Sequence, residues 1–148
     1  MQTFLPYQNI IKSVQCLDKR RICKQRIEAT QILNIILNKT ETKGWRKHPC
    51  VRQWIGFENC LIYYRNECIT EWTKRKNKDG SFCKNNMPLW EINGDIIYPD
   101  WFGYEEFHSC HRSTLLYKDY EWYSQFGWTE EPKYEYWWPS KNSKEILV

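Results

Sequence analysis

The chain has 148 residues, a formal net charge of +4 at pH 7, and 41% hydrophobic and 17% aromatic residues. This length predicts one domain with a substantial core, and the composition excludes a disordered chain. No stretch approaches the roughly 20 apolar residues of a membrane span, and the N-terminus lacks the basic and apolar segments of a signal peptide. Seven cysteines without a Cys-x-x-Cys pair indicate a reducing, intracellular compartment, the cytoplasm or the nucleus.

The first elements in chain order are an extended arm and a long helix. We expect residues 1–9 to be extended, because Pro6 cannot lie in the middle of a helix. Residues 10–37 have the periodicity of one amphipathic helix. Its predicted inner face carries Ile11, Val14, Leu17, Ile22, Ala29, Ile32 and Ile36, and its predicted wet face includes Lys12, Cys16, Lys19, Cys23, Thr30 and Asn34.

Two further helices follow. The second is predicted to begin at Pro49, which suits the first helical position, and to end near Lys76. The third is predicted to be capped by Asp100 and to end near Lys118. Residues 119–138 form an aromatic-rich arm and residues 139–148 a loose tail. The predicted fold is therefore all-α, a compact single domain of three main helices over residues 1–148.

Four polar residues interrupt the inner face of the first helix. Asp18, Arg21, Gln25 and Glu28 follow one another at spacings of three, four and three residues. Unpaired charges on a core-facing stripe cost several kcal/mol each. We therefore expect this quartet either to pair within the helix or to line a cleft in which chemistry takes place.

Basic and aromatic residues elsewhere are candidates for binding phosphates and bases. Each group also has a purely structural interpretation, as a solvated face, an ordinary helix start, packed histidines or core aromatics. The candidates are Arg20, Lys24 and Arg26 on the first helix, Arg46, Lys47 and His48 before the second, His108, His111 and Arg112 on the third, and Trp122, Tyr123 and Trp128 near the C-terminus. A zinc or di-iron site would need more ligands than these histidines offer, so we expect neither a metal nor a cofactor.

Several segments considered together form a recognisable pattern, namely Leu17-Asp18, Arg21, Lys24–Glu28, Gly44–Pro49 with Trp54, Phe107-His108, His111-Arg112, Leu115-Leu116, Lys118, Trp122-Tyr123 and Phe126–Trp128. In these segments the chain resembles the pyrimidine-dimer DNA glycosylases, the phage-type endonuclease V family. The resemblance is closest to a divergent cellular and viral branch. The resemblance implies a three-helix domain, a monomer that acts on damaged double-stranded DNA, and, if the chain is viral, packaging in the virion.

The resemblance also implies a mechanism, in which an N-terminal α-amine attacks the sugar C1′ and forms a Schiff base. The family uses a threonine exposed by loss of the initiator methionine, whereas Gln2 here is bulky enough to retain Met1. We therefore expect the amine of Met1 to act, with Lys24 as the fallback nucleophile. Glu28 is expected to stabilise the developing positive charge, with Asp18 as its rival.

From the same resemblance we expect Arg21 to bind a phosphate of the DNA backbone. Two alternatives to a glycosylase with AP-lyase activity stay open. One is a non-catalytic DNA-binding protein on the same scaffold, which the departure at Gln2 favours. The other is an unrelated enzyme that uses the carboxylates and histidines on a small molecule.

Overall fold

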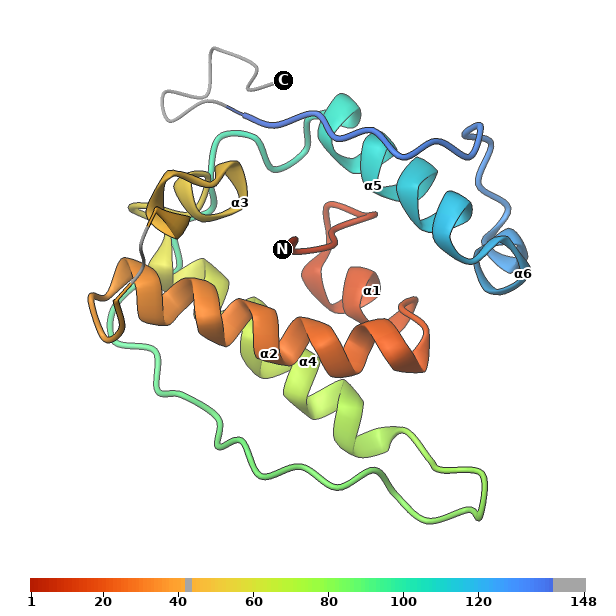
Figure 1. Ribbon diagram of the computed structural model, residues 1–148, viewed down its shortest axis with the longest axis horizontal. Coiled ribbons are helices and arrows are strands. Elements are labelled where there is room, and N and C mark those ends of the chain that lie inside the picture. The colour runs from red at the N-terminus through yellow and green to blue at the C-terminus, as the bar shows by residue number, and fades with distance from the viewer. Residues whose placement is uncertain (42–43, 140–148) are drawn as a thin grey trace.

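The computed structural model describes residues 1–41 and 44–139, and Figure 1 shows the arrangement of their helices. The elements are α1 (Ile10–Gln15), α2 (Lys19–Ile36), the 3-10 turn η1 (Trp45–Lys47), α3 (Pro49–Arg52), α4 (Glu58–Lys74), α5 (Glu105–Lys118), α6 (Tyr120–Tyr123) and the 3-10 turn η2 (Ser124–Phe126). Within these ranges no strand forms, and Lys76 and Phe82 make an isolated antiparallel bridge. The predicted all-α class is confirmed, with α2, α4 and α5 as the main helices. Residues 140–148 of the predicted tail lie outside the described residues.

The prediction of one helix over residues 10–37 is wrong, because the chain breaks between α1 and α2. Asp18 has an extended backbone, with φ −66° and ψ 160°, and serves as the N-cap of α2. Its backbone N–H donates to the hydroxyl of Tyr123 at 3.1 Å instead of to a helical carbonyl. The break shifts the helical phase, so that Ile11 is 40% exposed and Cys16 is buried, the reverse of the prediction.

The bounds of the predicted second and third helices also differ from those in the structure. Pro49 does start a helix, as predicted, but that helix ends at Arg52. The chain then turns through Gly56, whose φ of +91° favours glycine, before α4 begins. Asp100 does not cap the third helix, which starts at Glu105 after a turn, although its predicted end at Lys118 is confirmed.

The N-terminal arm lies between the helices rather than on the surface. Residues 2–5 are buried, with Gln2 4%, Thr3 0%, Phe4 6% and Leu5 0% exposed. Figure 1 shows the N-terminus in the middle of the molecule, between α2 on one side and α5 on the other. An extended segment in this position has no neighbouring strand, so its backbone groups need side-chain partners to offset desolvation.

Side chains from α2, α4 and α5 supply those partners. Gln25 of α2 donates to the carbonyl of Gln2 at 2.9 Å and accepts from the N–H of Phe4 at 2.8 Å. The hydroxyl of Tyr64 on α4 lies 2.8 Å from the carbonyl of Phe4. His111 of α5 accepts from the N–H of Leu5 at 2.8 Å. The arm is therefore held by all three long helices.

The segment after α4 runs back along that helix as an irregular chain (Figure 1). Asn66 donates to the carbonyl of Trp90 at 2.8 Å, and Arg65 donates to the carbonyl of Pro88 at 3.0 Å. None of the described helices combines the length and the apolar content that a bilayer-spanning helix requires.

Burial in α2 predicts the cost of shortening one of its core side chains. Leu33 is 0% exposed and belongs to the main hydrophobic cluster. We expect Leu33→Ala to lower the free energy of unfolding by about 2–5 kcal/mol, because it leaves a cavity. Leu37→Ala, the same change at a residue 41% exposed, should cost about 0.5 kcal/mol or less. Urea denaturation measures both, and equal losses would contradict the burial assigned to α2.

Candidate active site

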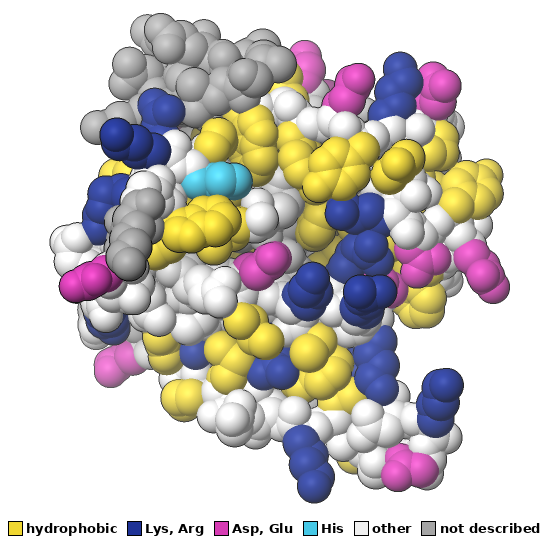
Figure 2. Space-filling model, viewed as in Figure 1, with side chains coloured by type: hydrophobic (Ala, Val, Ile, Leu, Met, Phe, Trp, Pro, Cys, Tyr) yellow, Lys and Arg dark blue, Asp and Glu magenta, His cyan; other side chains and the backbone are white. Residues whose placement is uncertain are grey.

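A pocket of about 330 Å³ opens between the N-terminal arm, α2, the end of α5 and the C-terminal segment. Its lining residues are Met1, Gln2, Phe4, Arg20, Arg21, Lys24, Gln25, Glu28, Lys118, Tyr134 and Tyr136. Six of the seventeen sequence-predicted site residues meet here, namely Met1, Arg20, Arg21, Lys24, Gln25 and Glu28. Figure 2 shows Lys and Arg side chains gathered near the centre of this face, next to hydrophobic side chains.

Glu28 is the carboxylate of this pocket. Burial raises its pKa, while the positive charges of the N-terminal amine, Lys24 and Lys118 act in the opposite direction. One of its oxygens, Oε2, accepts a hydrogen bond of 2.8 Å from the Nε2 group of Gln25. Both expectations for the quartet therefore hold for Gln25 and Glu28. Their side chains pair along the helix, and both line a pocket.

Asp18 and Arg21 form the second pair of the quartet. Arg21 donates to Asp18 at 3.2 Å, and burial raises the pKa of the Tyr123 hydroxyl, which also donates to Asp18. Asp18 itself does not line the pocket. It holds the guanidinium of Arg21 at the pocket wall, and Tyr123 holds Asp18.

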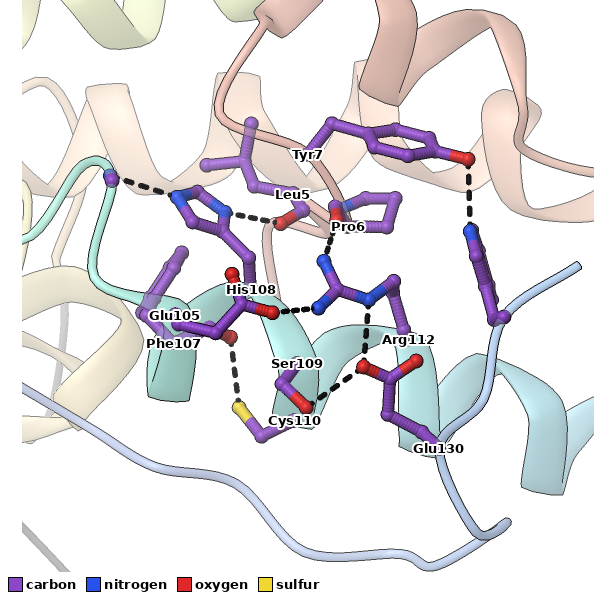
Figure 3. Close-up of polar contacts among 12 residues, drawn as sticks. Leu5, Pro6, Tyr7, Glu105, Phe107, His108, Ser109, Cys110, Arg112 and Glu130 are labelled. Carbon is purple, nitrogen blue, oxygen red and sulfur yellow. Dashed lines mark hydrogen bonds and ion pairs between the residues drawn. The ribbon is translucent and has the colours of Figure 1, made fainter. Parts of the chain in front are cut away.

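The polar residues of α5 hold the N-terminal arm (Figure 3). The Nδ1 group of His108 lies 2.8 Å from the carbonyl of Leu5, and Arg112 donates to the carbonyl of Pro6 at 2.7 Å. Arg112 is fixed in turn by Glu105 and Glu130. The structure therefore places His108, His111 and Arg112 against the arm and away from the pocket lining.

Both histidines of α5 are in their neutral form. Nε2 of His108 accepts from the N–H of Gly103 at 2.9 Å, and Nδ1 of His111 accepts from the N–H of Leu5. Burial is the main cause of a lowered pKa in both rings. The pKa of His108 lies below its usual value, and the pKa of His111 is lowered to about 3. Protonation would place an N–H donor against a backbone donor, so the folded state requires these rings unprotonated.

Two of the three predicted DNA contacts before the second helix, Arg46 and His48, have local structural partners. Arg46 donates to the carbonyl of Ile35 and to Asn38, and so caps the end of α2. Nδ1 of His48 accepts from the N–H of Cys50 at 3.1 Å and caps α3. Lys47 is exposed beside them. None of the three lines the pocket at Glu28.

Arg26 lies on the side of α2 that faces the segment after α4. It donates to Asn85 at 3.3 Å and lies 5.1 Å from the ring centre of Trp72. Arg26 is 9% exposed, and it does not line the pocket.

The predicted aromatic contacts pack mainly against the protein itself. Trp122 donates to the carbonyl of Cys16 at 2.8 Å, at the break between α1 and α2. Trp128 donates to the hydroxyl of Tyr7 at 2.8 Å and stacks on Tyr123 with ring centres 5.6 Å apart. Trp122 keeps 37% of its surface exposed, whereas Tyr123 is buried.

None of the predicted site residues lies on the far wall of the pocket. Lys118, Tyr134 and Tyr136 come from the end of α5 and the C-terminal segment. The ammonium of Lys118 lies 4.6 Å from the ring centre of Tyr134. The spacing of Tyr134 and Tyr136, two residues apart, is a weak signal for one face of an extended segment. Among the described residues, no group of three or more His, Cys, Asp or Glu side chains could hold a metal ion.

Neutral histidines in the fold predict a loss of stability in acid. The unfolded chain binds a proton on each histidine below about pH 6.5, and the folded state resists it down to the pKa of about 3 for His111. The free energy of unfolding should therefore fall by about 1.4 kcal/mol per pH unit for His111 as the pH decreases through this window. His108, whose pKa is also lowered by burial, acts in the same direction. His111→Asn keeps an acceptor for Leu5 and cannot titrate.

Urea denaturation between pH 7 and about pH 4 measures this difference. We expect the His111→Asn variant to be less stable than the parent protein at pH 7, because it packs less well, but to lose stability less steeply in acid. Identical slopes in the two proteins would contradict the assignment of His111 as a buried, neutral acceptor.

Comparison with known proteins adds one finding to this geometry. The family model of the pyrimidine dimer DNA glycosylases matches residues 1–85, more than half of the chain. No curated protein and no solved structure matches. The matched span holds the arm, α1–α4 and the pocket residues up to Glu28, while the far wall of the pocket lies outside it. This chain belongs to the pyrimidine dimer DNA glycosylase family.

Proposed function

We propose that this glycosylase removes a damaged pyrimidine through a covalent Schiff base between its N-terminal amine and the sugar, and that it then cleaves the strand as an AP lyase. Membership of the family supports damaged DNA as the substrate. One observation carries the mechanism, namely that Met1 and Glu28 line the same pocket. Burial raises the pKa of Glu28, and the positive charge of the N-terminal amine is the largest contribution that opposes this shift.

The chemistry needs a neutral amine and a nearby negative charge. The amine nitrogen forms a bond to C1′ as the N-glycosidic bond breaks, and the base departs with the electron pair and takes up a proton. Positive charge develops on the sugar at this point, and an ionised Glu28 would stabilise it electrostatically. Loss of the amine proton and opening of the sugar ring then give the imine.

The basic residues of the pocket fit a DNA backbone. Arg20, Arg21, Lys24 and Lys118 line the pocket together with Glu28. Arginine binds phosphate oxygens with paired hydrogen bonds, and lysine binds them as a point charge. We propose that Arg21, which Asp18 holds in place, contacts a phosphate next to the damaged nucleotide.

Borohydride reduction tests the covalent step directly. Incubation with a duplex that contains a pyrimidine dimer or an abasic site, followed by reduction, should give a stable protein–DNA adduct. Peptide mapping should place the adduct on the N-terminal residue, and the intact mass defines which residue that is. An adduct on Lys24 would identify the fallback nucleophile. Salt-dependent DNA binding without any adduct would contradict the mechanism and indicate a non-catalytic binding protein.

Substitution of Glu28 tests its electrostatic role. We expect Glu28→Gln to lower the rate of adduct formation by roughly 100-fold or more, since it removes the charge that stabilises the transition state. Glu91→Gln is a matched control, because Glu91 is exposed and does not line the pocket. The control should keep the parental rate. Single-turnover trapping measures both, and a Glu28→Gln rate equal to that of the control would rule out this role.

A further inference from the structure

Gln25 uses its whole side-chain amide in the described fold. Its Nε2 group donates to the carbonyl of Gln2 at 2.9 Å and to Oε2 of Glu28 at 2.8 Å. Its Oε1 atom accepts from the N–H of Phe4 at 2.8 Å and lies 2.7 Å from the hydroxyl of Tyr64. Both donors of the amide are therefore in use, and its oxygen accepts from Phe4 and shares the single hydroxyl proton of Tyr64 with the carbonyl of Phe4. Gln25 is only 1% exposed.

These contacts join the two reactive groups of the proposed site. Gln2 and Phe4 belong to the arm, on either side of Thr3, so two backbone contacts fix the direction in which the arm leads to its amine. Glu28 lies one turn further along α2 and receives the second N–H of the same amide. A shift of the Gln25 side chain would therefore move the amine and the carboxylate relative to each other.

We propose that Gln25 is a positioning residue, whose amide fixes the distance and orientation between the N-terminal amine and the carboxylate of Glu28. The inference rests on the proposed function, because that proposal makes the amine and Glu28 the reactive groups. It assigns no chemical step to Gln25 itself. An ionised carboxyl group at this position would offer no donor. An apolar side chain would leave the carbonyl of Gln2 and the N–H of Phe4 without their partner.

The charges around Glu28 determine how a second carboxyl group would titrate. The groups that face the pocket are the N-terminal amine, Arg20, Arg21 and Lys24 from α2, Lys118 from α5, and the hydroxyls of Tyr134 and Tyr136. These cations favour one ionised carboxylate. Two adjacent carboxyl groups would repel each other and titrate as a coupled pair, with one pKa raised.

Gln25→Glu is the test, because it keeps the size of the side chain and removes both donors. Near pH 8 we expect the rate of borohydride-trapped adduct formation to fall by about 10- to 100-fold, with little change in the dissociation constant for DNA. The ratio of the variant rate to the parental rate should rise by at least about tenfold between pH 8 and pH 5. The introduced carboxyl group then holds a proton and regains one donor.

Gln15→Glu makes the same change of charge at an exposed residue of α1 that does not line the pocket. This control should show a constant ratio to the parental rate at every pH. A Gln25→Glu ratio that is constant with pH, or a rate equal to that of the control, would overturn the positioning role.

A measurement without DNA separates this inference from the proposed function. NMR titration of the Glu28 side-chain carboxyl carbon should show its pKa shifted upward by about one pH unit or more in the Gln25→Glu variant. This shift is expected even if the parent protein forms no adduct, an outcome that would refute only the proposed reaction. An unshifted titration would refute the contact between the two side chains.

A second variant keeps the test open if Gln25→Glu does not fold. Tyr64→Phe removes only the hydroxyl that lies against Oε1 of Gln25 and the carbonyl of Phe4. We expect the trapping rate to fall by about threefold to tenfold while circular dichroism shows a folded protein. A folded Tyr64→Phe variant with the parental rate would count against positioning by this network.

Discussion

The fold depends on how an extended arm is accommodated inside a helical protein. Backbone groups of residues 2–6 are buried without a neighbouring strand, and leaving any of them unpaired would cost of the order of 1–3 kcal/mol. Gln25, Tyr64 and the polar residues of α5 provide the missing partners. Since α2 and α4 pack on one side of the arm and α5 lies on the other, the same contacts also join the two halves of the core.

This arrangement explains why the reactive groups lie in a partly buried pocket. An arm pinned along its length delivers its first residue to a defined place, beside Glu28 of α2. The amide of Gln25 contacts the arm at Gln2 and Phe4 and also contacts Glu28, so one side chain serves the packing of the arm and the geometry of the proposed reaction. Basic side chains at the rim offset the charge of the carboxylate and match the charge of a DNA backbone.

The helix-local features were predictable from the sequence, and the tertiary ones were not. Spacing along one helix was enough to pair Asp18 with Arg21 and to place Gln25 beside Glu28, because such contacts depend only on helical geometry. Periodicity did not predict the break before α2, where the N–H of Asp18 pairs with the hydroxyl of Tyr123, 105 residues away in sequence. The resemblance gave the family correctly, whereas the histidines of α5 and the far wall of the pocket needed the folded chain.

Native-state hydrogen exchange tests the central claim most directly, because the claim concerns the backbone of the arm. The amide protons of Phe4 and Leu5 donate to Gln25 and His111 in the buried centre. We predict that they exchange with protection close to that of the core amides of α2, which open only on global unfolding. Exchange of these two amides at the rate of an unstructured peptide would contradict the account, because the arm would then not be held between the helices.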